Sequence, residues 1–483
     1  MEPAIDPSLP LPVYVQLKTL LSEDIIRGRY GAGDRLPTEH ELCALFGISR
    51  TPVHRALAEL AEEGALLRHR GRGTFVNPHW VTQHGRADEL RIVVPEGPWQ
   101  DLVREACPSG VNLSVAAVAI DDLHQVLVRA VAEGRAPDVA ILDSVWVREF
   151  AASGFLRPLD ELDTGWLRDE YLEDELEPFR AANEYDGHPV AVQAEADVLG
   201  LWYRRQTLED AAILPPRTWS ELIKAGSALQ QQGVESPLAM PAGSRGGETT
   251  SYCLLGLLAT NGVEVFREGS VSIDAPGTID CLTMLSELGS SGALGRDAVG
   301  YERDRAIRLL AHGQATLAIG GSYELPALAA ETGLPVTRVW DKFGFAALPT
   351  GPREGASTLA GGMAHAVFRQ AANPHGAMRL LRELCSTTAV VEMSKRTGQL
   401  ASRRSAASLA AKESPFLATT AAMLDDAVVR PATPTYSRVS AQLQSMLEAV
   451  LVGRLRPAEA ARHTSDLICA ITGMPAERTR ASL

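Results

Sequence analysis

The chain has 483 residues, of which 45% are hydrophobic and 22% are charged, and its formal net charge is −14 at pH 7. The length allows roughly two to four domains, and the composition is that of an ordinary soluble globular protein. An acidic chain of this kind is not expected to coat nucleic acid without specificity.

The sequence also gives no signal for metal binding, for export or for membrane insertion. The six cysteines include no C-x-x-C pair, so neither a metal site nor a disulfide framework is expected. The N-terminus has no basic region followed by an apolar core, and no apolar run approaches about 20 residues. We therefore expect a cytoplasmic protein with no export signal and no membrane partner.

The first expected elements lie within residues 1–78. Residues 1–11 are rich in proline and should form a short arm or be disordered. A helix is predicted from Tyr14 to Arg27. Thr38 and Glu41 form a T-x-x-E capping box that opens a second helix, which Gly47 should end.

A third helix is predicted between Ser49, as its N-cap, and Gly64, which follows its last turn. Its buried face repeats at helical spacing and comprises Val53, Ala56, Leu57, Leu60 and Ala61. The short connection from the preceding helix is typical of a helix-turn-helix. Leu66 to Val76 is predicted to be a β-hairpin, or wing, with a glycine-rich tip.

These residues resemble the GntR family of bacterial transcription regulators. The matching segments are Pro12-Val13-Tyr14-Val15-Gln16, Leu36-Pro37-Thr38-Glu39, Ser49 to Leu57, and Gly71-Arg72-Gly73-Thr74-Phe75-Val76. The family usually has an arginine, commonly a base reader, where His54 stands here. Either Arg55 substitutes for it or the operator differs at that position.

The resemblance implies a winged helix that binds double-stranded DNA. We expect contacts from Arg35, Thr38, Glu39, Ser49, Arg50, Thr51, Pro52, His54, Arg55, Arg70, Gly71, Arg72, Gly73 and Thr74. One recognition helix covers only a few base pairs, so a homodimer on a pseudo-palindromic operator is expected. Arg50 should read a base, and Arg70 and Arg72 should contact phosphate or the minor groove.

A polar stretch, residues 79–89, reads as a linker, and strands alternate with helices from Leu90 onward. Asp121 is expected to cap a helix, and Asp143 and Ser144 follow a strand over 137–142. Ligands of open α/β sheets bind outside the carboxyl ends of the strands. The region of about 390 residues is too large for one core, so two lobes are expected.

The second region, residues 90–483, resembles extracellular solute-binding proteins of sugar ABC transporters, the maltose-binding-like group. The matching segments are Gly134 to Val139, Ala152 to Leu159, Tyr185 to Val190, Pro215 to Leu222, His312 to Gly321, Gly361-Gly362 and Thr397 to Leu400. The resemblance implies an α/β multidomain protein with a two-lobed, type II periplasmic-binding-protein-like domain. Lobe 1 is expected at about 90–196 and 343–390, and lobe 2 at about 197–342 and 391–483.

An effector, expected to be a sugar or oligosaccharide, is placed between these lobes and should weaken operator binding. The expected site residues are Glu96, Trp99, Asp143, Ser144, Trp146, Asp197, Tyr323, Gly361, Gly362 and Tyr436. A carboxylate such as that of Asp197 can accept two sugar hydroxyls, and Tyr323 can stack on a sugar face. In the alternative reading, Asp197 forms a hinge salt bridge and Tyr323 belongs to the core.

Three other functions were considered. A MocR-type regulator would carry a pyridoxal-phosphate-binding, aminotransferase-like domain, but none of the five lysines stands in a typical Schiff-base context. A glycosidase needs two facing carboxylates, and no local pattern pairs them. A structural adaptor that has lost ligand binding also fits. We expect a non-enzymatic regulator that acts as a repressor and carries no cofactor.

Overall fold

The chain divides into two compact units in a computed structural model that describes residues 5, 12–26, 29–69, 72–78, 80, 89–108, 111–356, 358–424 and 426–477. Unit 1 comprises Met1–Ala194 and Met363–Val390, and unit 2 comprises Glu195–Gly362 and Val391–Leu483. Residues 343–362, expected in lobe 1, therefore lie in unit 2. The reason is strand pairing, because the strands of this segment pair with the central strand of the unit 2 sheet.

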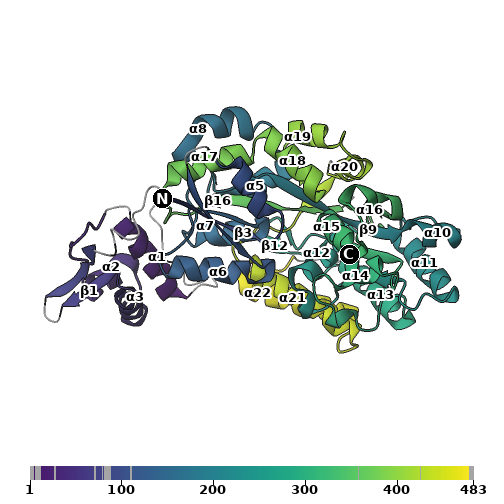
Figure 1. Cartoon of the computed structure of the whole chain (residues 1–483). Helices are drawn as coiled ribbons and strands as arrows, with labels where there is room; N and C mark the ends of the chain where they lie inside the picture. Colours follow the sequence, from purple (N-terminus) through teal and green to yellow (C-terminus); the bar gives the residue numbers. More distant parts are fainter. Residues whose placement is uncertain are drawn as a thin grey trace. The chain divides into compact units, whose positions relative to one another are not determined.

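The N-terminal part of unit 1 has the order of a winged helix (Figure 1). Its elements are α1 (Val13–Ile26), α2 (Glu39–Phe46), α3 (Arg50–Glu62) and the antiparallel strands β1 (Leu66–His69) and β2 (Gly73–Val76). Thr38 and Glu41 form the predicted capping box, and Gly47 ends α2 in the left-handed region. Ser49 occupies the N-cap of α3, but its side chain makes no capping hydrogen bond.

The core of this domain follows the predicted helical stripe. Val53, Ala56, Leu57 and Leu60 are buried, while Ala61 packs against the same cluster from a half-buried position. Gly64 has φ +77°, which suits the glycine that follows a helix C-cap. Of the expected linker, only Trp80 and Glu89 lie within the described residues, and Trp80 is buried in this core.

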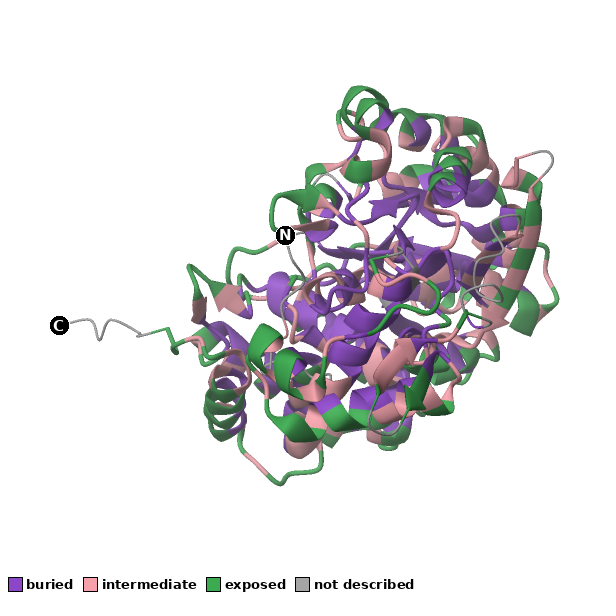
Figure 2. Cartoon of the chain, turned by 90° about the vertical axis from the view of Figure 1, so that its left-hand side faces the viewer, coloured by how far each residue is buried: buried purple, intermediate pink, exposed green. Residues whose placement is uncertain are grey.

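The remainder of unit 1 is built on a five-stranded sheet in the order β4-β3-β5-β16-β8. These strands are β3 (Glu89–Pro95), β4 (Asn112–Val118), β5 (Val139–Asp143), β8 (Val192–Gln193) and β16 (Met363–Val367). β3 runs parallel to β4 and β5, whereas β16 is antiparallel to β5 and β8. The residues of β5, β8 and β16 are almost all buried, whereas those of the edge strand β4 are exposed or half-buried, and the helices carry exposed residues on their outer sides (Figure 2).

In this part of unit 1 the expected alternation of strands and helices holds only from β3 to β5, after which several helices and then several short strands follow one another. The helices and minor strands are α5 (Trp99–Ala106), α6 (Ile120–Ala132), α7 (Val147–Ala152), α8 (Asp160–Trp166), a π-helical turn (Leu167–Tyr171), α9 (Glu177–Ala182), β6 (Glu184–Tyr185), β7 (His188–Pro189) and α17 (Pro374–Leu384). The expectation that Asp121 caps α6 is wrong, since Ala119 is the N-cap. Asp121 lies in the first turn, where a carboxylate still favours the positive end of the helix.

Unit 2 is organised around one long strand, β9 (Glu195–Arg204). β9 pairs with β13 (Leu317–Gly321), β14 (Phe343–Ala346), β15 (Thr358–Gly361) and β17 (Leu400–Ala401), while β10 (Leu238–Ala239) and β18 (Ala427–Val429) extend the sheet. The helices used below are α12 (Gly247–Ala259), α13 (Pro276–Ser291), α21 (Tyr436–Leu451) and α22 (Pro457–Thr472). The other helices are α10 (Arg205–Asp210), α11 (Trp219–Gln231), α14 (Arg305–Ala311), α15 (Leu325–Thr332), α16 (Val336–Lys342), α18 (Thr387–Thr397), α19 (Arg404–Ala410) and α20 (Pro415–Ala421).

Within unit 1, α1 belongs to two cores. Leu17 and Leu21 are buried in the core of the winged helix, whereas Val15 is buried with Leu123 and Leu127 of α6. α1 and α6 accordingly lie side by side (Figure 1). Over the described residues, none of the helices combines the length and apolarity that a membrane span requires.

Candidate DNA-recognition surface and solute-binding cluster

The exposed face of α3 carries Arg50 and His54, one helical turn apart. Both side chains are exposed, at 82% and 61%, as a surface that meets DNA requires. Both also contact Glu39 at the start of α2. Nε of Arg50 donates to Oε2 of Glu39 at 3.0 Å, and Nδ1 of His54 lies 2.9 Å from Oε1.

A third basic side chain reaches the same carboxylate from the wing. Nη2 of Arg68, in β1, donates to Oε1 of Glu39 at 2.9 Å. The hydrogen bond from His54 is the main reason that the pKa of Glu39 is lowered, and burial opposes it, while the Arg50 hydrogen bond lowers it further. Glu39 is therefore ionised at neutral pH and joins α2, α3 and β1.

Arg55, considered as a substitute base reader, is engaged within the protein. Its guanidinium lies 3.7 Å from the centre of the Tyr14 ring, and its Nη2 donates to the Tyr14 hydroxyl at 2.8 Å. Nε of Arg55 donates to Glu59 at 3.0 Å. Arg55 thus fastens α3 to α1, and its expected role on DNA stays a prediction.

The remaining expected DNA residues surround this face. Arg72 is exposed beside the wing, Gly73 and Thr74 lie in β2, and Thr51 and Pro52 lie in the first turn of α3. The side chain of exposed Arg35 covers Gly73, where an added Cβ would lie 2.8 Å from Nε of Arg35. Arg70 and Gly71, expected at the wing tip, lie outside the described residues.

Unit 2 brings four of the expected effector residues into one polar cluster: Asp197, Tyr323, Gly361 and Tyr436. We call it the β9–β15 cluster, and it also contains Glu248, Tyr252 and Arg430. Asp197, 7% exposed, lies in β9 and accepts a hydrogen bond from the Tyr252 hydroxyl at 2.5 Å. Gly361, at the end of β15, pairs with Asp197. A Cβ added there would lie 3.1 Å from Asp197 Oδ1, 3.1 Å from Arg430 Nη2 and 3.4 Å from the Tyr252 hydroxyl.

The cluster continues through Glu248 on α12. Oε1 of Glu248 accepts from Nη1 of Arg430 at 2.9 Å and from the Tyr436 hydroxyl at 2.6 Å, and Oε2 accepts from Ser440 at 2.7 Å. The guanidinium of Arg430 lies 5.0 Å from the centre of the Tyr252 ring. Sequence reasoning identified Asp197, Tyr436 and Gly361 but missed Glu248, Tyr252 and Arg430.

Tyr323 lies at the edge of the same cluster. It is half-buried, and its ring centre is 6.4 Å from that of Tyr252. Burial is the main reason that the pKa values of Tyr252 and Tyr323 are both raised well above the usual range, so both phenols keep their protons. Gly362 follows Gly361 with φ +143°, a conformation that favours glycine.

The other five expected effector residues belong to unit 1. Trp99 begins α5 and is 8% exposed, and Glu96 is exposed in the turn before it. Asp143 ends β5, where its carboxylate accepts from the backbone of Val145, and Ser144 follows. Trp146 packs edge-on against His124, with ring centres 5.1 Å apart. Trp146 is half-buried and packs against the core of unit 1.

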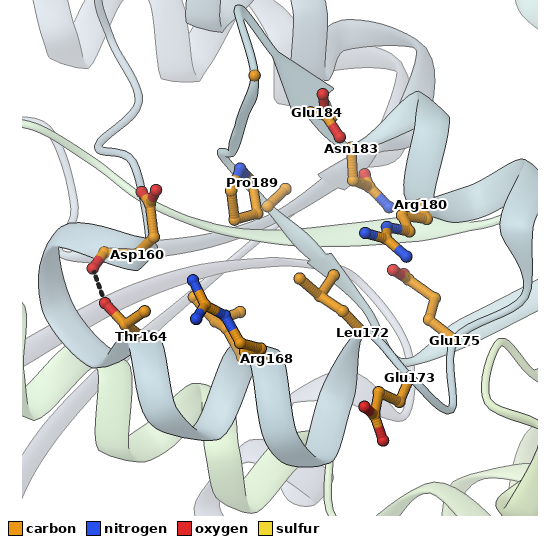
Figure 3. A pocket seen from close by; sticks show the side chains of 13 residues that line it. Asp160, Thr164, Arg168, Leu172, Glu173, Glu175, Arg180, Asn183, Glu184 and Pro189 are labelled. Atoms are coloured by element: carbon orange, nitrogen blue, oxygen red, sulfur yellow. Dashed lines mark hydrogen bonds between the residues drawn. The ribbon is translucent and has the colours of Figure 1, made fainter.

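A pocket of unit 1 contains none of the expected effector residues (Figure 3). Its volume is about 450 Å³, and α8, the π-helical turn, α9 and the β6–β7 hairpin surround it. The lining residues include Asp160, Arg168, Leu172, Arg180 and Asn183. This pocket gives the effector prediction no support. Among the described residues, no group of three or more His, Cys, Asp or Glu could hold a metal ion.

Both regions match known families. Residues 13–76 match the family described as bacterial regulatory proteins, gntR family, and residues 96–390 match bacterial extracellular solute-binding proteins. A putative binding protein of Brucella abortus is 23% identical over 77% of this chain and 90% of its own length. A histidine utilization repressor of Klebsiella aerogenes is 49% identical over 14% of this chain and 29% of its own length.

Solved structures give the same result for the fold. A solute-binding protein from Thermotoga lettingae, bound with α-D-tagatose, has a TM-score of 0.72 and 22% identity, covering 80% of this chain and 100% of its own. The chain belongs to the bacterial extracellular solute-binding protein family, and it carries an N-terminal GntR-type DNA-binding domain. These are non-enzymatic families, and the aminotransferase-like alternative is wrong for the large region, since residues 96–390 match solute-binding proteins.

Proposed function

We propose that the protein is a cytoplasmic transcription repressor that binds a pseudo-palindromic operator as a homodimer and is released by a small carbohydrate. The observation that carries the proposal is the pairing, in one chain, of an exposed Arg50–His54 face with the β9–β15 cluster. GntR-type relatives named as repressors, such as the histidine utilization repressor, support the proposed repressor role.

The chemistry of the cluster favours a polyhydroxylated solute. Asp197 and Glu248 supply carboxylate acceptors, whereas Arg430 supplies a donor and the hydroxyl of Tyr436 can do both. A sugar hydroxyl also donates and accepts, so it can bond to either kind of group. Tyr323 adds an aromatic face for the C–H side of a sugar ring. The unit 1 residues Trp99 and Trp146 remain further candidates.

The coupling between solute and operator is proposed to involve α1. This helix packs with the core of the winged helix through Leu17 and with α6 through Val15. A ligand shifts a conformational equilibrium only by its difference in affinity for the two states. A solute that favours a state with displaced α6 would move α1 and thereby change operator affinity.

The test combines DNA selection with ligand screening on the full chain. Selection from a pool of random duplexes should yield a pseudo-palindromic site with half-sites about one helical turn apart. A thermal-shift panel of mono- and oligosaccharides should identify a stabilising sugar, and that sugar should weaken binding to the selected duplex. A sugar that tightens the complex would reverse the sign, and no stabilisation by any sugar would contradict the carbohydrate assignment.

A further inference from the structure

The carboxylate of Glu39 is placed to orient the residues that read DNA. It contacts three basic groups from two elements: Arg50 and His54 of α3, and Arg68 of β1. Glu39 itself is only 18% exposed, whereas Arg50 and His54 point outward. The carboxylate thus lies beneath the side chains that are available to a base pair.

In each contact with Glu39, some nitrogen atoms of the basic side chain are not bonded to the carboxylate and can meet DNA. Nε of Arg50 is occupied by Glu39, so the two terminal nitrogens remain as an end-on pair of donors. Such a pair matches O6 and N7 of guanine in the major groove. An arginine that lacked the hydrogen bond to Glu39 would lose rotamer entropy when DNA immobilised it, and this loss would weaken binding.

The contact also fixes the histidine ring. An ionised carboxylate only accepts hydrogen bonds, so the proton must be on Nδ1 of His54. Nε2 is then the ring nitrogen that is left for the DNA, and in the neutral ring it is an acceptor. An acceptor suits the exocyclic amine of adenine or cytosine.

We infer that Glu39 is a positioning residue that sets the base preference of this protein by orienting Arg50 and His54. Glu39 restricts Arg50 and His54 to fewer conformations as they approach the major groove. It also adds one negative charge near the phosphates, which disfavours DNA binding in general. Its presence should therefore raise discrimination between sequences more than it raises affinity for DNA in general. The inference rests on the proposed operator binding.

The test uses the full chain and a pool of random duplex DNA. The wild type first defines a selected site, and affinities are then measured for this site, for single-base variants of it and for a scrambled duplex. Glu39→Gln is the main variant. Its amide oxygen can replace only one of the two carboxylate oxygens, and its NH₂ group then faces the donor or donors at the other position, so the three contacts cannot all persist. Glu62→Gln removes the same charge from an exposed position of α3 and is the control.

The expected result is a loss of selectivity. Discrimination at the bases read by Arg50 and His54 should fall about five- to tenfold in Glu39→Gln, while affinity for the scrambled duplex should be unchanged or higher. Glu62→Gln should retain the wild-type discrimination. In an Arg50→Ala background, Glu39→Gln should have no further effect at the base that Arg50 reads.

Two outcomes would overturn the inference. Unchanged discrimination in Glu39→Gln would mean that Arg50 and His54 are oriented without it. An equal loss for selected and scrambled duplexes, together with a lower melting temperature, would mean that Glu39 only stabilises the domain. A wild-type chain that selects no site would instead contradict the proposed operator binding.

Discussion

The hydroxyl of Tyr252 donates a hydrogen bond of 2.5 Å to the carboxylate of Asp197, across 55 residues of sequence. Tyr252 lies on α12 and Asp197 on β9, so this bond joins a buried helix to the central strand of unit 2. This bond helps to fix the orientation of the Asp197 carboxylate within the β9–β15 cluster.

The first prediction concerns solute binding by Asp197 and Tyr323. For the sugar identified by the thermal-shift panel, Asp197→Ala should weaken binding about tenfold or more, since a charge-assisted hydrogen bond contributes roughly 1.5–3 kcal/mol. Tyr323→Ala should also weaken it, through loss of the aromatic face. Calorimetry of each folded variant measures the effect, and Asp274→Asn, at an exposed position of unit 2, is the control. Wild-type affinity in both variants would place the solute elsewhere.

A second prediction concerns the stability of the cluster. Arg430→Met should lower the free energy of unfolding by about 1–3 kcal/mol, because Glu248 loses a charged donor while keeping Tyr436 and Ser440. Adding Glu248→Gln should recover part of the loss. Arg454→Met is the matched control, since that arginine is 66% exposed and its ion pair with Glu448 should contribute at most about 1 kcal/mol. Equal denaturant midpoints for the two methionine variants would contradict this account.

The third prediction separates phosphate contact from base reading. Arg72 is exposed beside the wing, so Arg72→Ala should weaken binding to selected and scrambled duplexes alike. The slope of log K against log salt should become shallower by about one unit. Gel-shift titrations at several salt concentrations measure this slope. Arg462→Ala, at an exposed position of unit 2, controls for net charge and should leave the slope unaltered.

The winged helix was predictable because its signals are local. The capping box of Thr38 and Glu41 and the left-handed Gly47 lie within one helix and its ends, and the structure contains both. Ser49 illustrates the limit of such signals. Its position at the N-cap was predicted correctly, but the hydrogen bond that usually accompanies this position is not formed.

The strand pairing of the unit 2 sheet could not be predicted from local signals. β9 pairs with strands that lie more than a hundred residues away, such as β13 and β15, and no local pattern specifies those partners. Glu248 and Tyr252 were missed because α12 is buried from Thr249 to Ala259, so its sequence has no separate apolar and polar faces that would show which residues line a site. Arg430 had a usable signal, since it directly follows the end of β18, where ligand-binding residues of α/β sheets often lie.

The last prediction concerns pH and the buried carboxyl of Glu324. This side chain follows β13, is 6% exposed and folds over Gly320. Burial raises its pKa to about 8; Arg303 opposes the shift, and Asp304 and Asp197 add to it. Between pH 4.5 and about 8 the folded protein keeps a proton that the unfolded chain has lost. Unfolding then releases a proton, so rising pH destabilises the fold through this group, by up to roughly 1.4 kcal/mol per pH unit.

Glu324→Gln should remove this contribution, because the amide is neutral at every pH, as the protonated carboxyl is. The variant should resemble the wild type near pH 5, become progressively more stable than it up to about pH 8, and keep a constant advantage above that. Melting temperatures measured from pH 5 to pH 9 give the difference directly. Glu287→Gln, at an exposed position of α13, should follow the wild type throughout. A pH-independent difference between Glu324→Gln and the wild type would mean that Glu324 is already ionised in the folded protein.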